Sequence, residues 1–386
     1  MDFNTISSSP TFCPAPWTSL NIDQTGRVSP CMHCFDAIGN LKKNSIQEVI
    51  HGDRLREIKQ NMARGEWDHS CRSCKQLEET TGVSGRTQRH ASQESIKAID
   101  ANLNWFSLEH IVVNWSNLCN LTCVYCNPDT STAWQQIKGI PINHVKNEHE
   151  DLIELAKEHG HTIQGLTLGG GEPLLQKGLV EFLKYLNPDQ TQVLVTTNLS
   201  IDLNNNPVYN ELRTWPSVQW TISFDNSDPD KFEYVRNGAT WEQFVKNIQL
   251  MKQHGQRVIA HPAYSIYCAF DLVEYYEFCI KNELDIYWCE LQHPLDLDVR
   301  RFPKNIRQQA ADEIDRIVNN FSQHTRLSID TLKRYKLTVV DNSYLADPDY
   351  QPNLLRFHRK IEAELNKTTT FEQLWPSLVQ QLKNNE

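Results

Sequence analysis

The sequence predicts an α/β protein: a parallel sheet preceded by a cysteine-bearing segment and followed by a helical region. Three observations predict this class. Six apolar runs alternate with helical patterns over residues 108–298, which favours a parallel sheet with right-handed crossovers. Five cysteines gather before residue 80, and after Pro294 the chain becomes polar with helical spacing. The 386 residues suffice for two or three domains.

Composition excludes several classes of protein. Hydrophobic residues at 39% and charged residues at 22% are typical of a globular chain rather than a disordered or fibrous one. No apolar run is long enough to cross a membrane, and the first residues lack a secretory pattern, so a cytoplasmic location is expected. The net charge of −10 disfavours nucleic acid as a partner. In a reducing compartment, the 11 cysteines are expected to be metal ligands or catalytic groups rather than disulfides.

Residues 1–80 are expected to form a compact module. A turn at Asp23–Gly26 lies between an alternating run and the extended Arg27-Val28, which predicts a hairpin. A capping box at Ser45–Glu48 starts a helical pattern whose apolar spacing extends to Met62. The chain then reaches a pair of cysteines.

The rest of the chain divides into three predicted parts. Polar residues 81–107 are expected to be a linker, residues 108–298 the sheet, and residues 299–386 a helical region without a catalytic motif. The expected strands are Ile111–Trp115, Gly165–Leu168, Gln192–Thr196, Val218–Phe224, Arg257–Tyr267 and Ile286–Leu291. The late helices are expected at Ile306–Phe321, Leu354–Leu365 and Phe371–Leu382, the last broken near Pro376. Functional loops of such a sheet lie at the carboxyl ends of its strands.

A dense cysteine group, Cys119-x3-Cys123-x2-Cys126, comes directly after the first of these strands. Three thiolates on one short loop can hold three irons of a 4Fe–4S cluster and leave the fourth open to a small molecule. A zinc site and buried structural cysteines are the alternatives, although no fourth zinc ligand lies nearby in the sequence.

Together with Leu168-Gly169-Gly170-Gly171-Glu172-Pro173 after the second strand, this loop resembles the radical S-adenosylmethionine (SAM) superfamily. The resemblance implies a partial (β/α)6 TIM barrel, a 4Fe–4S cluster on the three cysteines, and SAM bound at its open iron. Gly170 and Gly171 would let the backbone approach the methionine moiety, and Glu172 would accept from its amino group.

Further segments are similar to the family in register. Thr196-Thr197-Asn198-Leu199 looks like its Thr-Asn-Gly segment, with Leu199 replacing the glycine. The resemblance implies that SAM contacts come from Tyr125, Asn198, Ser223, Asp225 and Arg236. Arg236 would pair with the methionine carboxylate, for which its planar fork is suited, and its alternative is a surface arginine. Tyr125 would shield the cluster, and its alternative is a core aromatic residue.

The N-terminal cysteines resemble the auxiliary-cluster module of the same superfamily, the twitch domain, which is a half-size SPASM domain. The match is Cys13-x12-Gly26-x4-Cys31 followed by Cys71-x2-Cys74, although such modules usually follow the barrel. It implies that Cys13, Cys31, Cys71 and Cys74 hold a second, auxiliary 4Fe–4S cluster. Alternatively, Cys31-x2-Cys34 and Cys71-x2-Cys74 would bind zinc, and Cys34 could also replace one of the four iron ligands.

Three cysteines stand alone, at positions 268, 279 and 289. Cys268 ends the fifth expected strand and is therefore a candidate hydrogen-atom donor to a substrate radical. The alternative, that all three are small buried hydrophobic residues, is favoured.

The resemblance implies reductive cleavage of SAM to a 5′-deoxyadenosyl radical that abstracts a hydrogen atom from a substrate. A peptide substrate is favoured, with crosslinking, oxidation or epimerisation as the outcome, and flavodoxin or ferredoxin as the reductant. One alternative is dehydrogenation or rearrangement of a small molecule. Another is a non-catalytic iron–sulfur protein for electron transfer or binding, which would have no need for the Gly-Gly-Glu-Pro segment.

Overall fold

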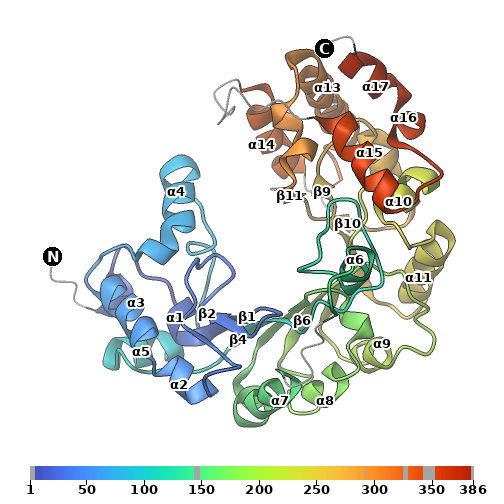
Figure 1. Cartoon of the computed structure of the whole chain (residues 1–386). Coiled ribbons are helices and arrows are strands. Elements are labelled where there is room, and N and C mark those ends of the chain that lie inside the picture. Colours follow the sequence, from blue (N-terminus) through green and yellow to red (C-terminus); the bar gives the residue numbers. More distant parts are fainter. Residues whose placement is uncertain (1–4, 143–147, 292, 325–328, 342–352, 384–386) are drawn as a thin grey trace. The chain divides into compact units, whose positions relative to one another are not determined.

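A computed structural model describes residues 5–142, 148–291, 293–324, 329–341 and 353–383 (Figure 1). Contacts between Cα atoms divide the chain into two compact units. Unit 1 comprises Met1–Leu118, Asn143–Val195 and Asn206–Val218, and unit 2 comprises Cys119–Ile142, Thr196–Asn205 and Gln219–Glu386. The boundaries expected near residues 80, 107 and 298 stay a prediction.

The predicted hairpin is present in unit 1. Strands β1 (Ser19–Ile22) and β2 (Arg27–Ser29) pair antiparallel, and β2 pairs with the short β3 (Gly39–Asn40). The Asp23 carboxylate stabilises the turn by accepting from the amide of Thr25 at 2.8 Å. The helices of this segment are η1 (Ile6–Ser8), α1 (Ala15–Thr18), α2 (Ile46–Ile50), α3 (Asp53–Ala63), η2 (His69–Cys71), α4 (Arg72–Thr81) and α5 (Gln93–Ala101). The capping box of Ser45 and Glu48 is confirmed at the start of α2.

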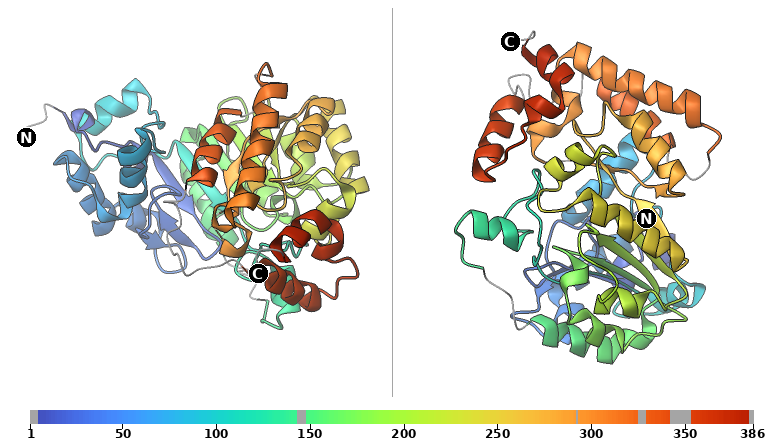
Figure 2. Two further views of the ribbon diagram at one scale, coloured as in Figure 1. Left: turned by 90° about the horizontal axis from the view of Figure 1, so that it is seen from above. Right: turned by 90° about the vertical axis from the view of Figure 1, so that its right-hand side faces the viewer.

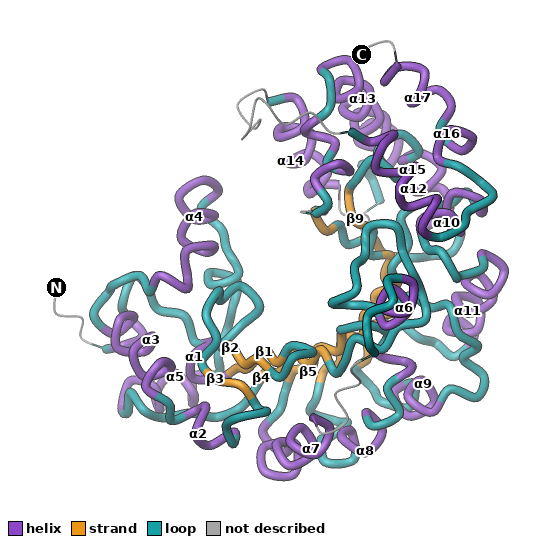
Figure 3. Tube along the Cα trace, viewed as in Figure 1, coloured by secondary structure: helices purple, strands orange, loops and turns teal. Residues whose placement is uncertain are grey.

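The hairpin extends the parallel sheet of unit 1. Strand β1 pairs parallel with β4 (His110–Asn114), with Leu20 opposite Ile111, and β4 pairs parallel with β5 (Gly165–Gly169) (Figure 3). Strand β6 (Gln192–Thr197) continues the order on the far side of β5. Helices α7 (Glu148–His159), η3 (Gly160–Thr162), η4 (Pro173–Leu175), α8 (Leu179–Leu183) and α9 (Pro207–Leu212) connect these strands.

Unit 2 continues the α/β alternation, with β7 (Val218–Ile222), β8 (Arg257–Ala260) and β10 (Asp285–Ile286) in parallel pairs. The expected fifth and sixth strands are each interrupted: β9 (Ala263–Tyr264) and β11 (Cys289–Glu290) form a separate parallel pair. The long strands predicted over Arg257–Tyr267 and Ile286–Leu291 were therefore wrong in extent. Pro262 lies at the break between β8 and β9, where it cannot donate to the ladder.

The helices of unit 2 cover its strands and form the predicted C-terminal helical region. They are α6 (Thr132–Ile137), α10 (Pro229–Val235), α11 (Trp241–Gln253), α12 (Leu272–Lys281), η5 (Leu295–Leu297), η6 (Val299–Arg301), α13 (Lys304–Phe321), α14 (Ile329–Val340), α15 (Leu354–Glu364), α16 (Phe371–Leu374) and α17 (Pro376–Lys383). Figure 2 shows α13 and α14 lying side by side. The break at Pro376 separates α16 from α17, as expected. The α/β class with a helical C-terminal region is confirmed.

Aromatic residues just beyond the strands of unit 2 pack on α12. Phe224, after β7, stacks on Tyr275 of that helix, with ring centroids 4.6 Å apart. Trp288, between β10 and β11, donates through Nε1 to the hydroxyl of Tyr276 on the same helix, at 3.0 Å.

Leu199 carries backbone strain that its sequence position predicts. Its φ is +54°, the left-handed region that favours glycine, and its side chain is buried. We expect Leu199→Ala to destabilise the fold more than Leu199→Gly, by about 1 kcal/mol, because both variants lose the buried side chain but only glycine relieves the strain. Chemical denaturation of the two variants measures this order. If Leu199→Gly were instead less stable than Leu199→Ala, as glycine is relative to alanine inside a helix, the strain at Leu199 would be absent.

Candidate functional site

The loop Cys119–Cys126 lies in unit 2 and is held by backbone hydrogen bonds to the segment after α10. The amides of Thr122 and Val124 donate to the carbonyls of Asn237 and Val235, each at 3.0 Å. On the other side, Trp134 of α6 donates through Nε1 to the carbonyl of Cys123 at 3.0 Å. These hydrogen bonds fix the backbone of the loop from two sides.

Each thiol of this loop lies beside a polar group. Asn198 donates to the sulfur of Cys119 at 3.8 Å, and Arg236 donates to that of Cys123 at 3.9 Å. The sulfur of Cys126 lies 3.2 Å from the hydroxyl of Thr130. Donors of this kind stabilise thiolate ligands and tune the potential of a bound cluster. Burial raises the pKa of Cys123 to about 12, so a metal group binding here would displace its proton.

The carboxylate of Asp225, only 1% exposed, organises the residues around the loop. One oxygen accepts from the hydroxyl of Tyr125 at 2.8 Å and from Nε and Nη2 of Arg236 at 3.0 and 2.9 Å. The other oxygen accepts from the amide of Ala263 at 3.1 Å. The guanidinium also lies over the ring of Tyr125, 5.2 Å from its centroid. Three of the predicted SAM contacts thus come together, and Arg236 is not a surface residue.

Charge pairing dominates this network. Burial acts to lower the pKa of Arg236, but Asp225, Tyr125 and Cys123 together outweigh burial and raise that pKa well above the ordinary value. Burial raises the pKa of Tyr125 well above its ordinary value, so its hydroxyl remains a donor. Arg236 is therefore a cation whose Nε and Nη2 bond to an acid of the same chain, with Nη1 directed to a cysteine sulfur.

The glycine-rich segment lies in unit 1, after β5. A Cβ on Gly171 would lie 2.4 Å from the carbonyl oxygen of Leu118, and one on Gly170, whose φ is +103°, would lie 2.7 Å from that of Ser116. The amides of Gly171 and Glu172 donate to those two carbonyls at 2.8 Å. These glycines thus permit a close approach to the backbone that leads into the cysteine loop. The buried Glu172 carboxylate accepts from the amide of Leu174 at 3.0 Å.

The strand ends of unit 2 present polar groups that sequence analysis missed. Ser223, among the predicted contacts, is half-buried, and its amide donates to the carbonyl of Thr197 at 2.9 Å. His261, just beyond β8, bonds through Nδ1 to the carbonyl of Tyr287 at 2.7 Å, and the two rings stack 5.5 Å apart. Because a carbonyl only accepts, Nδ1 carries the proton and Nε2 is an acceptor. No local sequence pattern indicates this pair, since its members lie 26 residues apart in loops beyond the strands.

Of the three isolated cysteines, Cys268 and Cys279 are buried and Cys289 is partly buried. Cys268 is fully buried, and its thiol lies 3.4 and 3.5 Å from the carbonyls of Ser265 and Ala263 in its own loop. Burial raises its pKa. Cys279 is fully buried on α12, and Cys289 donates to the carbonyl of Pro262 at 3.4 Å. These surroundings favour the structural interpretation for all three.

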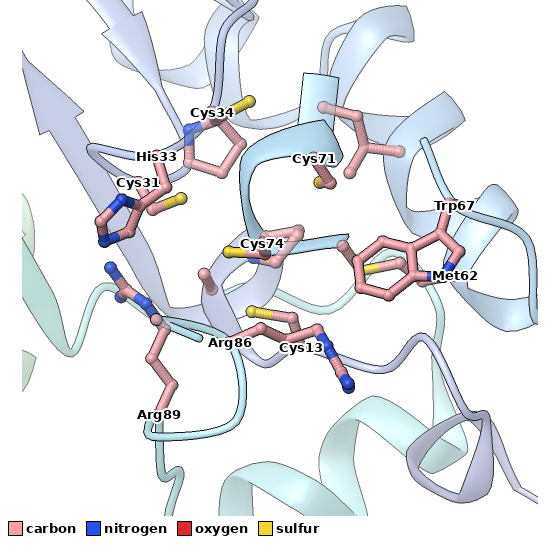
Figure 4. Close-up of a pocket in the computed structure, with 15 residues that line it drawn as sticks. Cys13, Cys31, His33, Cys34, Met62, Trp67, Cys71, Cys74, Arg86 and Arg89 are labelled. Atoms are coloured by element: carbon pink, nitrogen blue, oxygen red, sulfur yellow. The ribbon is translucent and has the colours of Figure 1, made fainter. Parts of the chain in front are cut away.

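A second cysteine site lies wholly within unit 1, in a pocket (Figure 4). Cys13 precedes α1, Cys31 follows β2, and Cys71 and Cys74 lie where η2 continues into α4. All five cysteines, Cys34 included, line this pocket, and Figure 4 draws their side chains around it. Cys34 donates to the hydroxyl of Ser70 at 3.3 Å. The structure thus brings all five N-terminal cysteines to one pocket, and the choice of four ligands among them stays a prediction.

Electrostatics in this pocket favour a group that brings positive charge. Burial raises the pKa of Cys13 to about 12, and the other thiolates add to this effect, while Arg89 opposes it. Arg86, which also lines the pocket, forms an ion pair with Glu78 and donates to the carbonyl of Phe12 at 2.8 Å. Among the described residues, no three acidic, imidazole or thiol side chains lie close enough to share a single metal ion.

Comparison with known proteins identifies the class. Residues 113–278 match the radical SAM superfamily, and residues 13–75 match the iron–sulfur cluster-binding SPASM domain. The chain therefore carries a radical SAM domain over residues 113–278. More particularly, it carries a SPASM-family domain on the N-terminal side of the radical SAM domain. No helix in the described ranges is long and apolar enough to span a bilayer.

Two curated proteins are similar over part of the chain. GTP 3′,8-cyclase of Peptoclostridium acidaminophilum is 26% identical over 195 residues, 48% of this chain and 55% of the relative. 7-Carboxy-7-deazaguanine synthase of Clostridium acetobutylicum is 28% identical over 173 residues, 44% of this chain and 67% of the relative. The chain spans about half the length of the first of these. The crystal structure of Streptococcus suis SuiB bound to precursor peptide SuiA superposes with a TM-score of 0.43 at 14% identity, covering 72% of this chain and 63% of that one.

The auxiliary pocket depends on a buried acid. The carboxylate of Asp68 accepts from Arg54 at 2.6 and 3.0 Å, from Asn61 at 2.8 Å and from the amide of Ser70 at 2.9 Å. Burial opposes its ionisation, but these bonds outweigh burial and hold the pKa of Asp68 well below its usual range. Its stabilisation is therefore fully present above the unfolded pKa of about 3.9 and is lost as pH falls through the lower folded value.

We expect Asp68→Asn to lower the free energy of unfolding by about 2–3 kcal/mol at pH 7, with a smaller difference from wild type near pH 3. Denaturant titrations at the two pH values measure this. Glu57→Gln is the matched control, since Glu57 pairs with the same Arg54 at the surface and its loss is expected to cost about 0.5 kcal/mol or less. Equal losses in the two variants would contradict the buried role of Asp68.

Proposed function

We propose that this protein reductively cleaves SAM and abstracts a hydrogen atom from an organic substrate, for which we favour a peptide. The observation that carries the proposal is the three-thiol loop, fixed by backbone bonds beside the Asp225–Arg236–Tyr125 network. When bound, a 4Fe–4S cluster with an open iron supplies the electron that converts SAM to the 5′-deoxyadenosyl radical. The protein holds the cofactor, orients the substrate carbon and excludes water.

The donor set suits such a cluster. Cys119, Cys123 and Cys126 would hold three irons, and the donors beside their sulfurs would stabilise the thiolates. Arg236 donates to the sulfur of Cys123, and Asp225 balances its charge. We therefore propose that Arg236 stabilises the thiolate that binds the cluster, and that Asp225 orients the guanidinium of Arg236. Gly170, Gly171, Glu172, Asn198, Ser223 and Tyr125 remain the proposed SAM contacts.

In the N-terminal pocket, Cys13, Cys31, Cys71 and Cys74 would hold the auxiliary 4Fe–4S cluster. The hydrogen bond of Cys34 to Ser70 favours a position outside the ligand set, and zinc is the alternative occupant. The auxiliary cluster would take back an electron from the product radical or shape the substrate cavity. Flavodoxin or ferredoxin is the proposed reductant.

The substrate class has one competing candidate. Auxiliary modules in the family often accompany peptide modification, which favours a peptide. The names of the similar curated proteins instead favour dehydrogenation or rearrangement of a small molecule such as a purine nucleotide. The acceptor Nε2 of His261 beside the exposed ring of Tyr287 suits any planar group that donates a hydrogen bond. A hydrogen-donor role for Cys268 is the weaker alternative, given its bonds within its own loop.

The radical chemistry is tested under anaerobic conditions. Reconstituted wild type with dithionite and SAM is expected to form 5′-deoxyadenosine, detected by chromatography and mass spectrometry. Cys123→Ala is expected to lose this product, because the third iron loses its ligand. Cys279→Ala, which removes a buried thiol outside the loop, is the matched control and should retain it. Undiminished product from Cys123→Ala would show that the cluster on this loop is not the one that cleaves SAM, whereas no product from wild type would favour the non-catalytic iron–sulfur alternative.

Metal analysis tests the auxiliary site. Wild type is expected to bind about eight irons per chain, with sulfide to match. Cys31→Ala should bind roughly half of that iron, whereas Cys34→Ala should bind nearly all of it because the proposed ligand set leaves the thiol of Cys34 bonded to Ser70. About four irons plus one zinc in wild type would instead make the N-terminal pocket a structural zinc site.

A further inference from the structure

We propose that Lys367, in the C-terminal region outside the family's motifs, is a positioning residue for the cysteine loop and raises the reduction potential of the cluster held there. This inference rests on the proposed function, since it concerns the same cluster. It also gives a role to part of residues 299–386, to which the sequence assigns none.

The C-terminal helices are attached to the segment that holds the loop. The hydroxyl of Tyr234, at the end of α10, lies 2.8 Å from the carboxylate of Glu362 and 2.8 Å from Nδ1 of His358, both on α15. The ring of His358 stacks on Phe371 of α16 at 3.9 Å. The next residue, Val235, accepts from the amide of Val124 in the loop. The C-terminal helices thus bind Tyr234, and its neighbour Val235 bonds to the backbone of the cysteine loop.

Lys367 makes the most direct connection. Its ammonium donates to the side-chain oxygen of Asn237 at 2.8 Å. Asn237 in turn donates from its amide nitrogen to the hydroxyl of Thr122 at 2.7 Å and accepts from the amide of Thr122 at 3.0 Å. Thr122 immediately precedes Cys123. Asn237 therefore links the ammonium to the backbone of a proposed iron ligand.

A second connection approaches the loop from its other side. Glu364 forms an ion pair with Lys138 at 2.6 Å, and Lys138 follows α6, the helix whose Trp134 bonds to the carbonyl of Cys123. Residues 362–367 therefore touch both elements that flank the loop. A segment placed in this way restricts the motion of the cysteine loop. It also contributes to the electrostatic potential around the loop.

The charge on Lys367 is not cancelled by a direct ion pair. Its ammonium lies over the ring of Tyr234, 4.6 Å from the centroid, and no carboxylate of the described residues lies within 4.0 Å. Burial lowers its pKa to about 8, although the charges of Glu362 and Cys123 oppose this shift, so the cation predominates at pH 7. Arg236, by contrast, is balanced by Asp225. Lys367 thus adds positive charge beside the cluster, which stabilises the more negative reduced state.

The experiment is a redox titration of the reconstituted full-length protein, followed by electron paramagnetic resonance. The SAM-dependent change in the signal identifies the cluster on the cysteine loop. Lys367→Met removes the charge and the donor, Lys367→Gln removes the charge but keeps a donor for Asn237, and Lys367→Arg keeps both. Lys184→Met, which removes an exposed lysine paired with Glu181, is the control.

We expect the midpoint potential of the SAM-responsive cluster to fall in the Met and Gln variants and to stay near wild type in the Arg and control variants. The fraction of this cluster reduced at a fixed potential should fall several-fold, with iron content and unfolding midpoint retained in at least the Gln variant. Unshifted potentials in both Lys367→Met and Lys367→Gln would overturn the inference about Lys367 but leave the proposed function standing. An equal fall in the Arg variant would overturn the charge argument. Wild type without a SAM-responsive cluster would overturn the proposed function as well.

Discussion

The buried carboxylate of Asp225 is the constraint on which the site in unit 2 depends. A buried charge is stable only when it is paired and its lone pairs are satisfied. Here the partners come from three parts of the chain: Tyr125 of the cysteine loop, Arg236 after α10 and Ala263 of β9. Satisfying one acid therefore fixes the loop, the helix end and the strand ends relative to one another.

This network also changes the role assigned to Arg236. The family resemblance makes it the partner of the methionine carboxylate of SAM, and in this chain the carboxylate of Asp225 bonds to Nε and Nη2. An arginine paired in this way orients a directional hydrogen bond to the cysteine sulfur but adds little net charge to the site. The reason is that the electric field of an ion pair falls off faster with distance than that of a single ion. The local positive potential then depends on neighbours such as Lys367.

The sequence predicted those features that depend on local spacing. The hairpin around Asp23–Gly26, the capping box at Ser45 and the break at Pro376 all follow from preferences of a few adjacent residues, and the structure contains them. The cysteine loop could be identified for the same reason, because its three thiols lie close together in the chain. Roles proposed for individual site residues stay predictions.

Features that depend on pairing between distant segments could not be predicted. Nothing in the composition of Ser19–Ile22 indicates that it pairs with β4, since an apolar strand suits several neighbours. The stack of His261 on Tyr287 and the bond from Lys367 to Asn237 join residues far apart in sequence. The interruption between β8 and β9 was missed because the apolar run continues through Pro262. A hydrophobic pattern does not show that proline lacks the backbone N–H with which a strand residue bonds to its neighbour.

The parallel pairing of β1 with β4 bears on how this architecture can change in evolution. A module attached by a flexible linker can be lost or exchanged at little cost to its neighbour. Here, removal of the N-terminal segment would leave β4 as an edge strand, with Ile111 and Val113 losing the neighbour that now pairs with them. Unpaired edges of this kind favour aggregation. We therefore expect the cysteine-bearing N-terminal segment and the parallel sheet to be inherited together and in this order, because β1 of the segment pairs with β4 of the sheet.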